Sequence, residues 1–299
     1  MANSRRKILV TGASGQLGSY VLRELKQRGE ETIAWSKQPN VELFDTACQS
    51  IDLAKVDEVA EAFEAAKPDI VIHAAAMSGV GACFRDPPQA RQTNVTATRM
   101  LAELADRHKA RLVYVSTDLV FDGNKKWYKE TDCPAPLSVY GNSKASAERS
   151  VLRHEQHLVL RLSLLFGPSI NGRPSFFEQQ IQSLREGTSC ALFEDEWRTP
   201  LSLQVAAEGV LAAGQSDIAG IIHLGGPERL SRLEMGQRLA RVLGKNESSL
   251  VAAKREDLPS GEPRPRDTSL ACDRWDQKIH DFERVGFEDA LLAMEVGAK

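Results

Sequence analysis

Three glycines near the start of the chain, in VTGASGQLGSYV (residues 10–21), constrain its fold more than any other feature. Gly12, Gly15 and Gly18 lie between a short apolar run and a helical pattern, which is the context of a dinucleotide-binding turn. There, one glycine allows the tight bend, one lets the backbone approach a pyrophosphate, and one lets the helix pack closely on the strand. A purely structural glycine turn is the weaker alternative in this context. The same loop supplies further candidate cofactor ligands: Thr11, Ser14, Gln16 and Leu17.

Strand and helix patterns alternate through the first half of the chain. Apolar runs predict strands at residues 7–10, 31–35, 69–76, 110–117 and 157–167, and helical spacing predicts helices at 15–29, 57–67, 93–108 and 140–154. Repeated βα units imply a parallel sheet with helices on both faces. The predicted fold class is therefore α/β, a doubly wound Rossmann sheet with a smaller C-terminal substrate lobe.

The regular alternation of strand and helix patterns ends after Gly167, where loop-like stretches and isolated helical patterns replace the βα units. The chain has 299 residues and is 42% hydrophobic, enough for one large domain or two lobes. We expect an NAD(P)-binding lobe over residues 1–168, with return elements near 203–225. The substrate lobe is expected over residues 169–202 and 226–299.

Composition excludes several classes of protein. A net charge of -3 without blocks of like charge argues against nucleic acid as a partner. Five scattered cysteines without a Cys-x-x-Cys pair give no disulfide framework or zinc site and suit a reducing compartment. Without a signal-peptide pattern or a run long enough for a bilayer, we expect a cytoplasmic protein with no membrane partner. The acidic run 194–196 could bind a cation, but a solvated loop is our interpretation, and no metal site is predicted.

The residues after the second predicted strand bear on which dinucleotide binds. Ser36 and Lys37 occupy the region where an acidic residue would hold the ribose 2′-hydroxyl of NAD. A lysine suits a 2′-phosphate, so NADP(H) is favoured and NAD(H) remains possible; an ordinary solvated lysine is the alternative. Asp52 and Leu53 could contact the adenine edge, although Asp52 could equally cap the helix that follows.

A tyrosine and a lysine stand four residues apart on a predicted helix, which places Tyr140 and Lys144 on one face. The pKa of a tyrosine is near 10, and bringing it toward 7 requires roughly 4 kcal/mol of phenolate stabilisation. A neighbouring ammonium can supply much of that. A chance pair on an exposed helix is the alternative. Hydroxyls at Ser116 and Thr117 end a buried strand, at the edge where α/β sheets bind ligands.

Together these stretches resemble the extended short-chain dehydrogenases/reductases and, more narrowly, the dTDP-4-dehydrorhamnose reductase family. The resemblance covers nearly the whole chain in order. The matching stretches are TGASGQLG, PDIVIHAAAMS, TNVTAT, VYVSTDLVFDG, PLSVYGNSKASAE, LRLSLLFG, WRTPLS, GIIHLGG and RPRDTSL.

The resemblance implies a reaction and roles for matching residues. Thr117 would hydrogen-bond the substrate carbonyl oxygen, Tyr140 would donate a proton to it, and Lys144 would hold the nicotinamide ribose. Hydride would pass from NADPH to C4 of a 4-keto deoxysugar nucleotide. The expected cofactor cleft also includes His73, Ala74, Ala75, Ala76 and Ser116, with Ser163, Leu164 and Leu165 near the nicotinamide. Asn94 would support the active-site strand, with simple helix capping as the alternative. Expected substrate contacts are Ser78, Arg198, Thr199, Arg264 and Arg266.

Two departures from the family pattern leave other functions open. VGACFRDP, residues 80–87, stands where the reductases carry acidic residues facing the sugar, so Gly81 and Phe84 put the particular sugar in doubt. Leu119 replaces the glutamate expected of a 4,6-dehydratase, which argues against dehydration. The alternatives are a dinucleotide-binding regulatory subunit resembling the beta subunit of methionine adenosyltransferase and a nucleotide-sugar epimerase. The expected partners are a nucleotide-sugar substrate and, as a possible assembly, a second copy of the chain in a homodimer.

Overall fold

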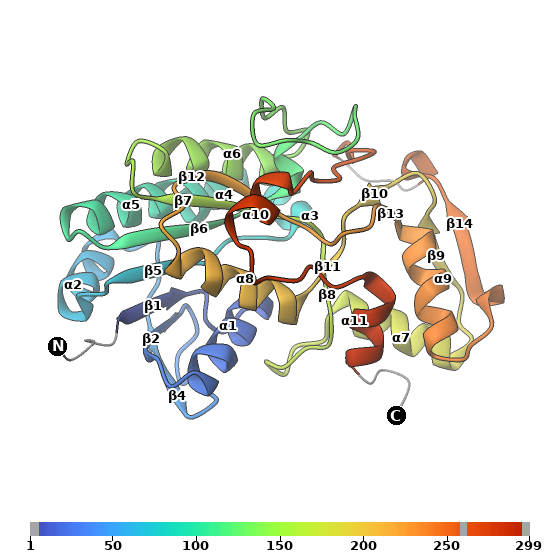
Figure 1. Ribbon diagram of the computed structural model, residues 1–299, viewed down its shortest axis with the longest axis horizontal. Coiled ribbons are helices and arrows are strands. Elements are labelled where there is room, and N and C mark those ends of the chain that lie inside the picture. Colours follow the sequence, from blue (N-terminus) through green and yellow to red (C-terminus); the bar gives the residue numbers. More distant parts are fainter. Residues whose placement is uncertain (1–5, 258–261, 295–299) are drawn as a thin grey trace.

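The computed structural model describes residues 6–257 and 262–294, which form an α/β fold around one large sheet (Figure 1). Its eight strands run in the order β12-β7-β6-β5-β1-β2-β4-β3. All neighbours pair in parallel except β3 and β4. The strands are β1 (Lys7–Thr11), β2 (Glu31–Ser36), β3 (Glu42–Leu43), β4 (Thr46–Ser50), β5 (Ile70–His73), β6 (Arg111–Thr117), β7 (Leu158–Leu162) and β12 (Gly220–Leu224).

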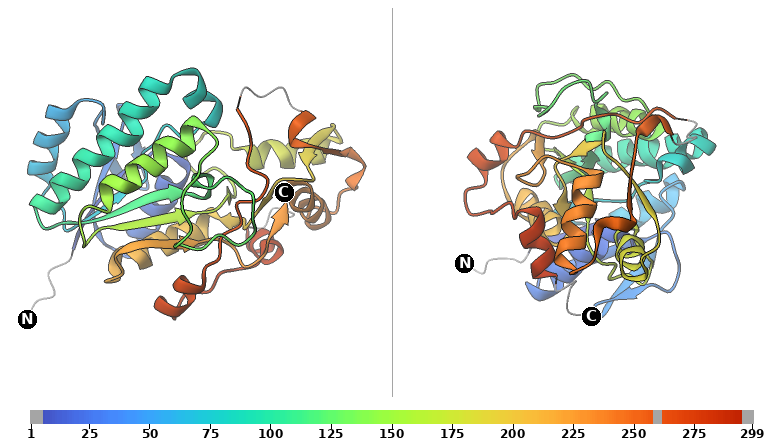
Figure 2. Two further views of the ribbon diagram at one scale, coloured as in Figure 1. Left: turned by 90° about the horizontal axis from the view of Figure 1, so that it is seen from above. Right: turned by 90° about the vertical axis from the view of Figure 1, so that its right-hand side faces the viewer.

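Helices cover both faces of this sheet (Figures 1 and 2). Successive residues of β1 pack on opposite sides, Val10 with the core under α1 and α8 and Leu9 with the core under α2, α5 and α6. Both faces are apolar because parallel sheets are buried on each side. The predicted doubly wound fold is thus confirmed. The helices are α1 (Gln16–Gln27), α2 (Val56–Ala66), α5 (Ala97–Arg107), α6 (Val139–Val151) and α8 (Leu203–Gln215).

The strand order reverses direction at β1, which has β5 on one side and β2 on the other. The connections leaving β1 and β5 therefore run to opposite faces, and a crevice opens at the carboxyl ends of these strands. This topology fixes where a ligand can bind.

A smaller lobe lies at one end of the sheet (Figure 1). Its core combines Phe166, Ile181, Leu239 and Leu291, which come from well-separated parts of the chain. Its elements are β8 (Leu165–Phe166), α7 (Phe176–Glu186), β9 (Cys190–Phe193), β10 (Trp197–Arg198), β11 (Leu201–Ser202), β13 (Leu230–Ser231), α9 (Arg232–Val242), β14 (Leu250–Ala253) and α11 (Phe287–Ala293). The helix α10 (Asp273–Lys278) packs instead against β12, with Trp275 in the core of the large sheet. The lobe boundaries drawn from sequence stay a prediction, and their parts at 1–5, 258–261 and 295–299 lie outside the described residues.

The structure differs from the sequence prediction in local detail. The helix predicted over 93–108 begins as a π-helical turn, η1 (Gln92–Thr96), before α5. π turns recur at functional sites, and here the turn contains the buried Asn94. The VGACFRDP stretch, for which the sequence predicted no helix, forms α3 (Val80–Arg85) and the start of α4 (Pro87–Arg91). Short 3-10 turns cover η2 (Asp118–Val120), η3 (Glu247–Ser249) and η4 (Arg255–Asp257). Among the described residues, none of the helices has both the length and the apolar character that crossing a bilayer requires.

Candidate active site

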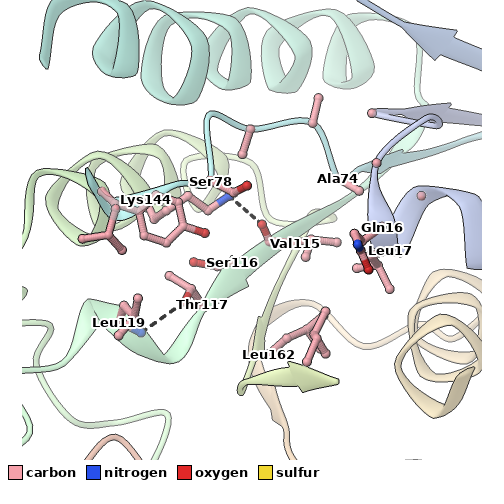
Figure 3. A pocket seen from close by; sticks show the side chains of 18 of the residues that line it. Gln16, Leu17, Ala74, Ser78, Val115, Ser116, Thr117, Leu119, Lys144 and Leu162 are labelled. Carbon is pink, nitrogen blue, oxygen red and sulfur yellow. Dashed lines mark hydrogen bonds between the residues drawn. The ribbon is translucent and has the colours of Figure 1, made fainter. Parts of the chain in front are cut away.

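A cleft of about 820 Å³ opens at the carboxyl ends of β1, β5 and β6 (Figure 3). Both lobes line it: the glycine loop and β-strand ends come from the sheet, and α7, α9 and the segment around Arg264 come from the smaller lobe. Predicted site residues that line the cleft are Thr11, Gly12, Ser14, Gly15, Gln16, Leu17, Gly18, Lys37, Asp52, Leu53, Ala74, Ala75, Ala76, Ser78, Ser116, Thr117, Tyr140, Lys144, Ser163, Leu164, Leu165, Arg198 and Arg264.

The glycine loop leaves no room for side chains where it meets its neighbours. Gly12 has φ +70°, and a Cβ there would lie 2.6 Å from the Ala75 backbone nitrogen. A Cβ on Gly18 would collide with the Gly12 carbonyl, so α1 starts directly against the loop. Gly15 is the N-cap of α1, and no side chain of the described residues caps that end. The free N–H groups of α1 therefore face the cleft, which fits a dinucleotide pyrophosphate.

The end of β2 forms the next part of the wall. Lys37 pairs with Asp52, with Nζ 3.2 Å from Oδ2. Asp52 accepts the Ala54 N–H in a tight turn, and the N-cap of α2 is Lys55, so Asp52 does not cap that helix. Ser36 is buried behind the cleft lining, where its hydroxyl hydrogen-bonds the Ser14 hydroxyl at 2.8 Å.

Two other predicted residues also lie behind the lining. His73 is fully buried and hydrogen-bonds the hydroxyls of Thr11 at 2.7 Å and Thr98 at 2.9 Å. Burial lowers the pKa of His73 to about 3, so it is neutral. Asn94 bonds the Met77 backbone through both amide atoms and donates to the Ser143 hydroxyl at 2.9 Å. Asn94 thus ties the β5 exit to α6 without lining the cleft.

The departures from the family pattern lie beside the cleft. Neither Gly81 nor Phe84 is among the cleft-lining residues, and Phe84 is 46% exposed. Cys83 is buried and its thiol donates to the Met77 carbonyl at 3.1 Å. The α3 residue that lines the cleft is Val80, so α3 faces the site with an apolar side chain.

The end of β6 and the first two turns of α6 bring Thr117, Tyr140 and Lys144 to one part of the cleft. Figure 3 shows Lys144 directed toward β6, where its ammonium donates to the Val115 carbonyl at 2.7 Å. That nitrogen also lies 4.1 Å from the centre of the Tyr114 ring. Ser138 caps α6 by accepting the Gly141 N–H, which fixes where the helix begins.

The electrostatics of this group differ from the expectation that Lys144 lowers the tyrosine pKa. Burial and the nearby Asp118 raise the pKa of Tyr140, while a hydrogen bond with Thr117 opposes the rise. Burial lowers the pKa of Lys144 to about 7, against the opposing charge of Glu148. Tyr140 therefore keeps its proton at neutral pH and can donate it, and Lys144 is the group that titrates near neutrality.

Arginines and carboxylates cluster where the smaller lobe closes the cleft. Arg198 is buried, with Nε 3.5 Å from Asp118 and Nη2 3.3 Å from Glu196. Arg264 lies 3.6 Å from Glu196 and Arg232 lies 4.0 Å from it. The interpretation of 194–196 as a solvated run is therefore wrong for Glu196, which is 5% exposed because these guanidinium groups offset its charge.

Two expected substrate contacts fall outside the cleft lining. The Thr199 hydroxyl accepts the Leu270 N–H, and the Arg266 guanidinium lies over the Trp197 ring. The described residues hold no cluster of three or more His, Cys, Asp or Glu side chains able to bind a metal ion. Lining residues that the sequence did not reveal are Trp35, Ile51, Val80, Thr93, Val115, Asp118, Leu119, Ser138, Leu162, Arg173, Phe176, Glu196, Arg232, Pro263 and Pro265. The sequence could have indicated Asp118 as a cleft residue, because Asp118 directly follows Ser116 and Thr117 at the end of a predicted strand.

Comparisons with known proteins find relatives along nearly the whole chain. A family model described as RmlD substrate binding domain matches residues 6–294. The chain is 29% identical over 292 residues to the probable low-salt glycan biosynthesis reductase Agl14 of Haloferax volcanii, covering 96% of each. It is 30% identical over 293 residues to methionine adenosyltransferase 2 subunit beta of Danio rerio, covering 96% of this chain and 89% of that one.

A solved structure shares the fold. The dTDP-4-dehydrorhamnose reductase of Bacillus anthracis, in complex with NADP, superposes with a TM-score of 0.85 at 22% identity, covering 97% of this chain and 98% of that one. Because the family model spans almost all of the described residues, the chain belongs to the RmlD family of extended short-chain dehydrogenases/reductases, a family of NAD(P)-dependent oxidoreductases.

Proposed function

We propose that this protein is an NADPH-dependent reductase of a 4-keto deoxysugar nucleotide, similar to dTDP-4-dehydrorhamnose reductase. The observation that carries the proposal is the convergence of Thr117, Tyr140 and Lys144 in one cleft with the glycine loop. A cleft in which those three side chains share a wall with a pyrophosphate cradle can place a carbonyl between an acid and a nicotinamide.

The residues of the chain suggest how the reaction proceeds. The free N–H groups at the start of α1 would hold the pyrophosphate, and Lys144 would bind the nicotinamide ribose. When bound, NADPH would supply the hydride that reduces the carbonyl carbon. Tyr140, protonated at neutral pH, would give its proton to the carbonyl oxygen, and the Thr117 hydroxyl would donate a hydrogen bond to the same oxygen.

The arginines support a nucleotide-sugar substrate. Arg198 already faces two carboxylates, so its role would be to hold Glu196 and Asp118 in place. Arg264 is 43% exposed, with its guanidinium 3.6 Å from Glu196 and over the Phe193 ring, and its exposed side is available for a substrate phosphate. The relatives named as a glycan biosynthesis reductase and a dTDP-4-dehydrorhamnose reductase support the same substrate class.

We also propose that the protein works in the cytoplasm. Its five free thiols suit such a reducing compartment.

The test is NADPH oxidation, followed by absorbance, with a panel of 4-keto nucleotide sugars of different nucleotide and sugar. Stoichiometric loss of NADPH with formation of the 4-hydroxy sugar is expected for at least one member. Isomerisation of a nucleotide sugar without net loss of the cofactor would instead identify an epimerase. Tight NADPH binding with no turnover of any carbonyl would contradict the reductase proposal.

A dinucleotide-binding regulatory subunit is the second candidate. It is favoured by the 30% identity to methionine adenosyltransferase 2 subunit beta along almost the whole chain. To distinguish the two candidate functions, the protein is mixed with a methionine adenosyltransferase catalytic subunit and run on a size-exclusion column. Co-elution together with absent carbonyl turnover would favour the regulatory role, and separate elution with turnover would favour the reductase.

A further inference from the structure

We propose that Arg173, which the smaller lobe supplies, binds the 2′-phosphate of NADP(H) and makes the site select NADP(H) over NAD(H). The inference rests on the proposed dinucleotide function and deepens it. The sequence pointed to Lys37 for this role, because Lys37 follows β2. The structure brings a second cation to the same end of the cleft from a segment 136 positions later in the chain, since Arg173 and Lys37 both line it.

Residues 168–174, here called the 168–174 loop, are attached to the cofactor side of the cleft. At its start, the Tyr20 hydroxyl on α1 donates to the Pro168 carbonyl at 2.8 Å. In its middle, the Asn171 amide donates to the Ser14 carbonyl of the glycine loop at 3.0 Å. The other amide atom of Asn171 accepts the Arg173 backbone N–H at 3.1 Å. The loop that carries Arg173 is thus positioned by the same elements that form the pyrophosphate cradle.

The Arg173 side chain reaches the end of β2. Its guanidinium donates to the Gln38 side-chain carbonyl, and Gln38 is the neighbour of Lys37. In this fold the ribose 2′ position faces the residues at the end of the second strand, about 20 residues after the glycine motif. The backbone N–H of Gln38 is itself tied to the buried Ser36 hydroxyl at 3.1 Å. A guanidinium anchored at Gln38 therefore lies where a 2′-phosphate would project.

The charges at this end of the cleft favour Arg173 over Lys37 as the selecting group. Lys37 is already paired with Asp52, so the two side chains together carry no net charge. Arg173 bonds the neutral Gln38 amide, and it forms no ion pair within the part of the chain that the structure describes. A phosphate dianion would gain a bidentate charged partner there, whereas a 2′-hydroxyl would gain little.

Equilibrium binding to the full-length protein tests this without any turnover. The probes are 2′,5′-ADP and 5′-AMP, which carry the adenosine end with and without the 2′-phosphate, measured by calorimetry together with NADPH and NADH. For Arg173→Gln we expect 2′,5′-ADP and NADPH to bind about tenfold more weakly, with 5′-AMP and NADH changed less than about twofold. Arg173→Lys should lie between, because it keeps the charge but loses the planar fork.

The matched control is Arg153→Gln. Arg153 is exposed in the turn after α6 and lies outside the cleft lining, so that variant should bind all four ligands as the wild type does. Equal weakening of 2′,5′-ADP and 5′-AMP by Arg173→Gln would overturn the inference, because it would show a general role of the loop. Unchanged 2′,5′-ADP binding, or a wild type that does not prefer 2′,5′-ADP to 5′-AMP, would also overturn it. Because all of these measurements are of equilibrium binding, they test the role of Arg173 separately from the proposed reductase activity.

Discussion

The buried pair of Glu148 and Arg161 behind the active-site wall gives the most quantitative prediction. The Glu148 and Arg161 side chains are 2% and 1% exposed, and Arg161 donates to the two carboxylate oxygens at 3.0 and 2.7 Å. Glu148 also accepts the hydroxyl of the cleft residue Ser116 at 2.5 Å. Glu148→Gln keeps the shape but leaves a buried guanidinium without its counter-charge. Breaking such a pair costs about 3–5 kcal/mol of unfolding free energy, a large part of the ~5–15 kcal/mol typical of a domain.

Urea unfolding followed by circular dichroism measures this loss as a lower midpoint at an unchanged slope. The matched control is Glu103→Gln on α5, whose partner Arg99 and whose own side chain are more than half exposed; we expect it to cost under about 0.5 kcal/mol. Replacing both members, Glu148→Leu with Arg161→Met, should cost much less than Glu148→Gln alone, because no unpaired charge is left. A loss below about 1 kcal/mol in Glu148→Gln, or a double variant no better than the single one, would refute this reasoning.

Two further predictions concern the cleft. Because burial lowers the pKa of Lys144 to about 7, kcat/KM for reduction should fall as pH rises through about 7, when the ammonium is lost. Glu148→Gln should shift this fall in kcat/KM to lower pH, because the Glu148 carboxylate favours the charged form of Lys144. A kcat/KM profile that is flat from about pH 6 to 9 would contradict the role given to the Lys144 ammonium. Gly12→Ala should weaken NADPH binding by about tenfold or more in a fluorescence titration, because the position has φ +70° and its Cβ would press on the Ala75 backbone. Gly187 also has a positive φ (+69°), but it is the C-cap of α7 and a Cβ there would meet no atom within 4 Å, so Gly187→Ala should keep normal affinity; equal losses in both variants would show that backbone strain alone is responsible.

Local sequence rules captured the parts of the molecule whose geometry is set by near neighbours. The glycine spacing indicated the start of α1, and the four-residue spacing placed Tyr140 and Lys144 on one helix face, both of which the structure has. The parallel sheet followed from repeated βα units. The protonation states did not follow, because the pKa of Tyr140 depends on burial and on Asp118, which only the folded chain brings near.

Features built by distant segments could not be predicted. Arg173 lies in a stretch with no periodic pattern, and only the folded 168–174 loop brings it to the end of β2. Glu196 looked like part of a solvated acidic run, yet Arg232 and Arg264 from distant segments join its near neighbour Arg198 around it. In each case the decisive partner is far along the chain, and no spacing rule reports it.

The most direct test of the central claim is the single-turnover rate of NADPH oxidation by Tyr140→Phe, measured with NADPH affinity in the same preparation. The phenol hydroxyl is the proposed proton donor. With a carbonyl substrate that the wild type reduces, the single-turnover rate of Tyr140→Phe should therefore be about 10²–10⁴-fold lower, while the dissociation constant of NADPH changes less than about twofold. A Tyr140→Phe protein that reduces the carbonyl at close to the wild-type rate would contradict the account.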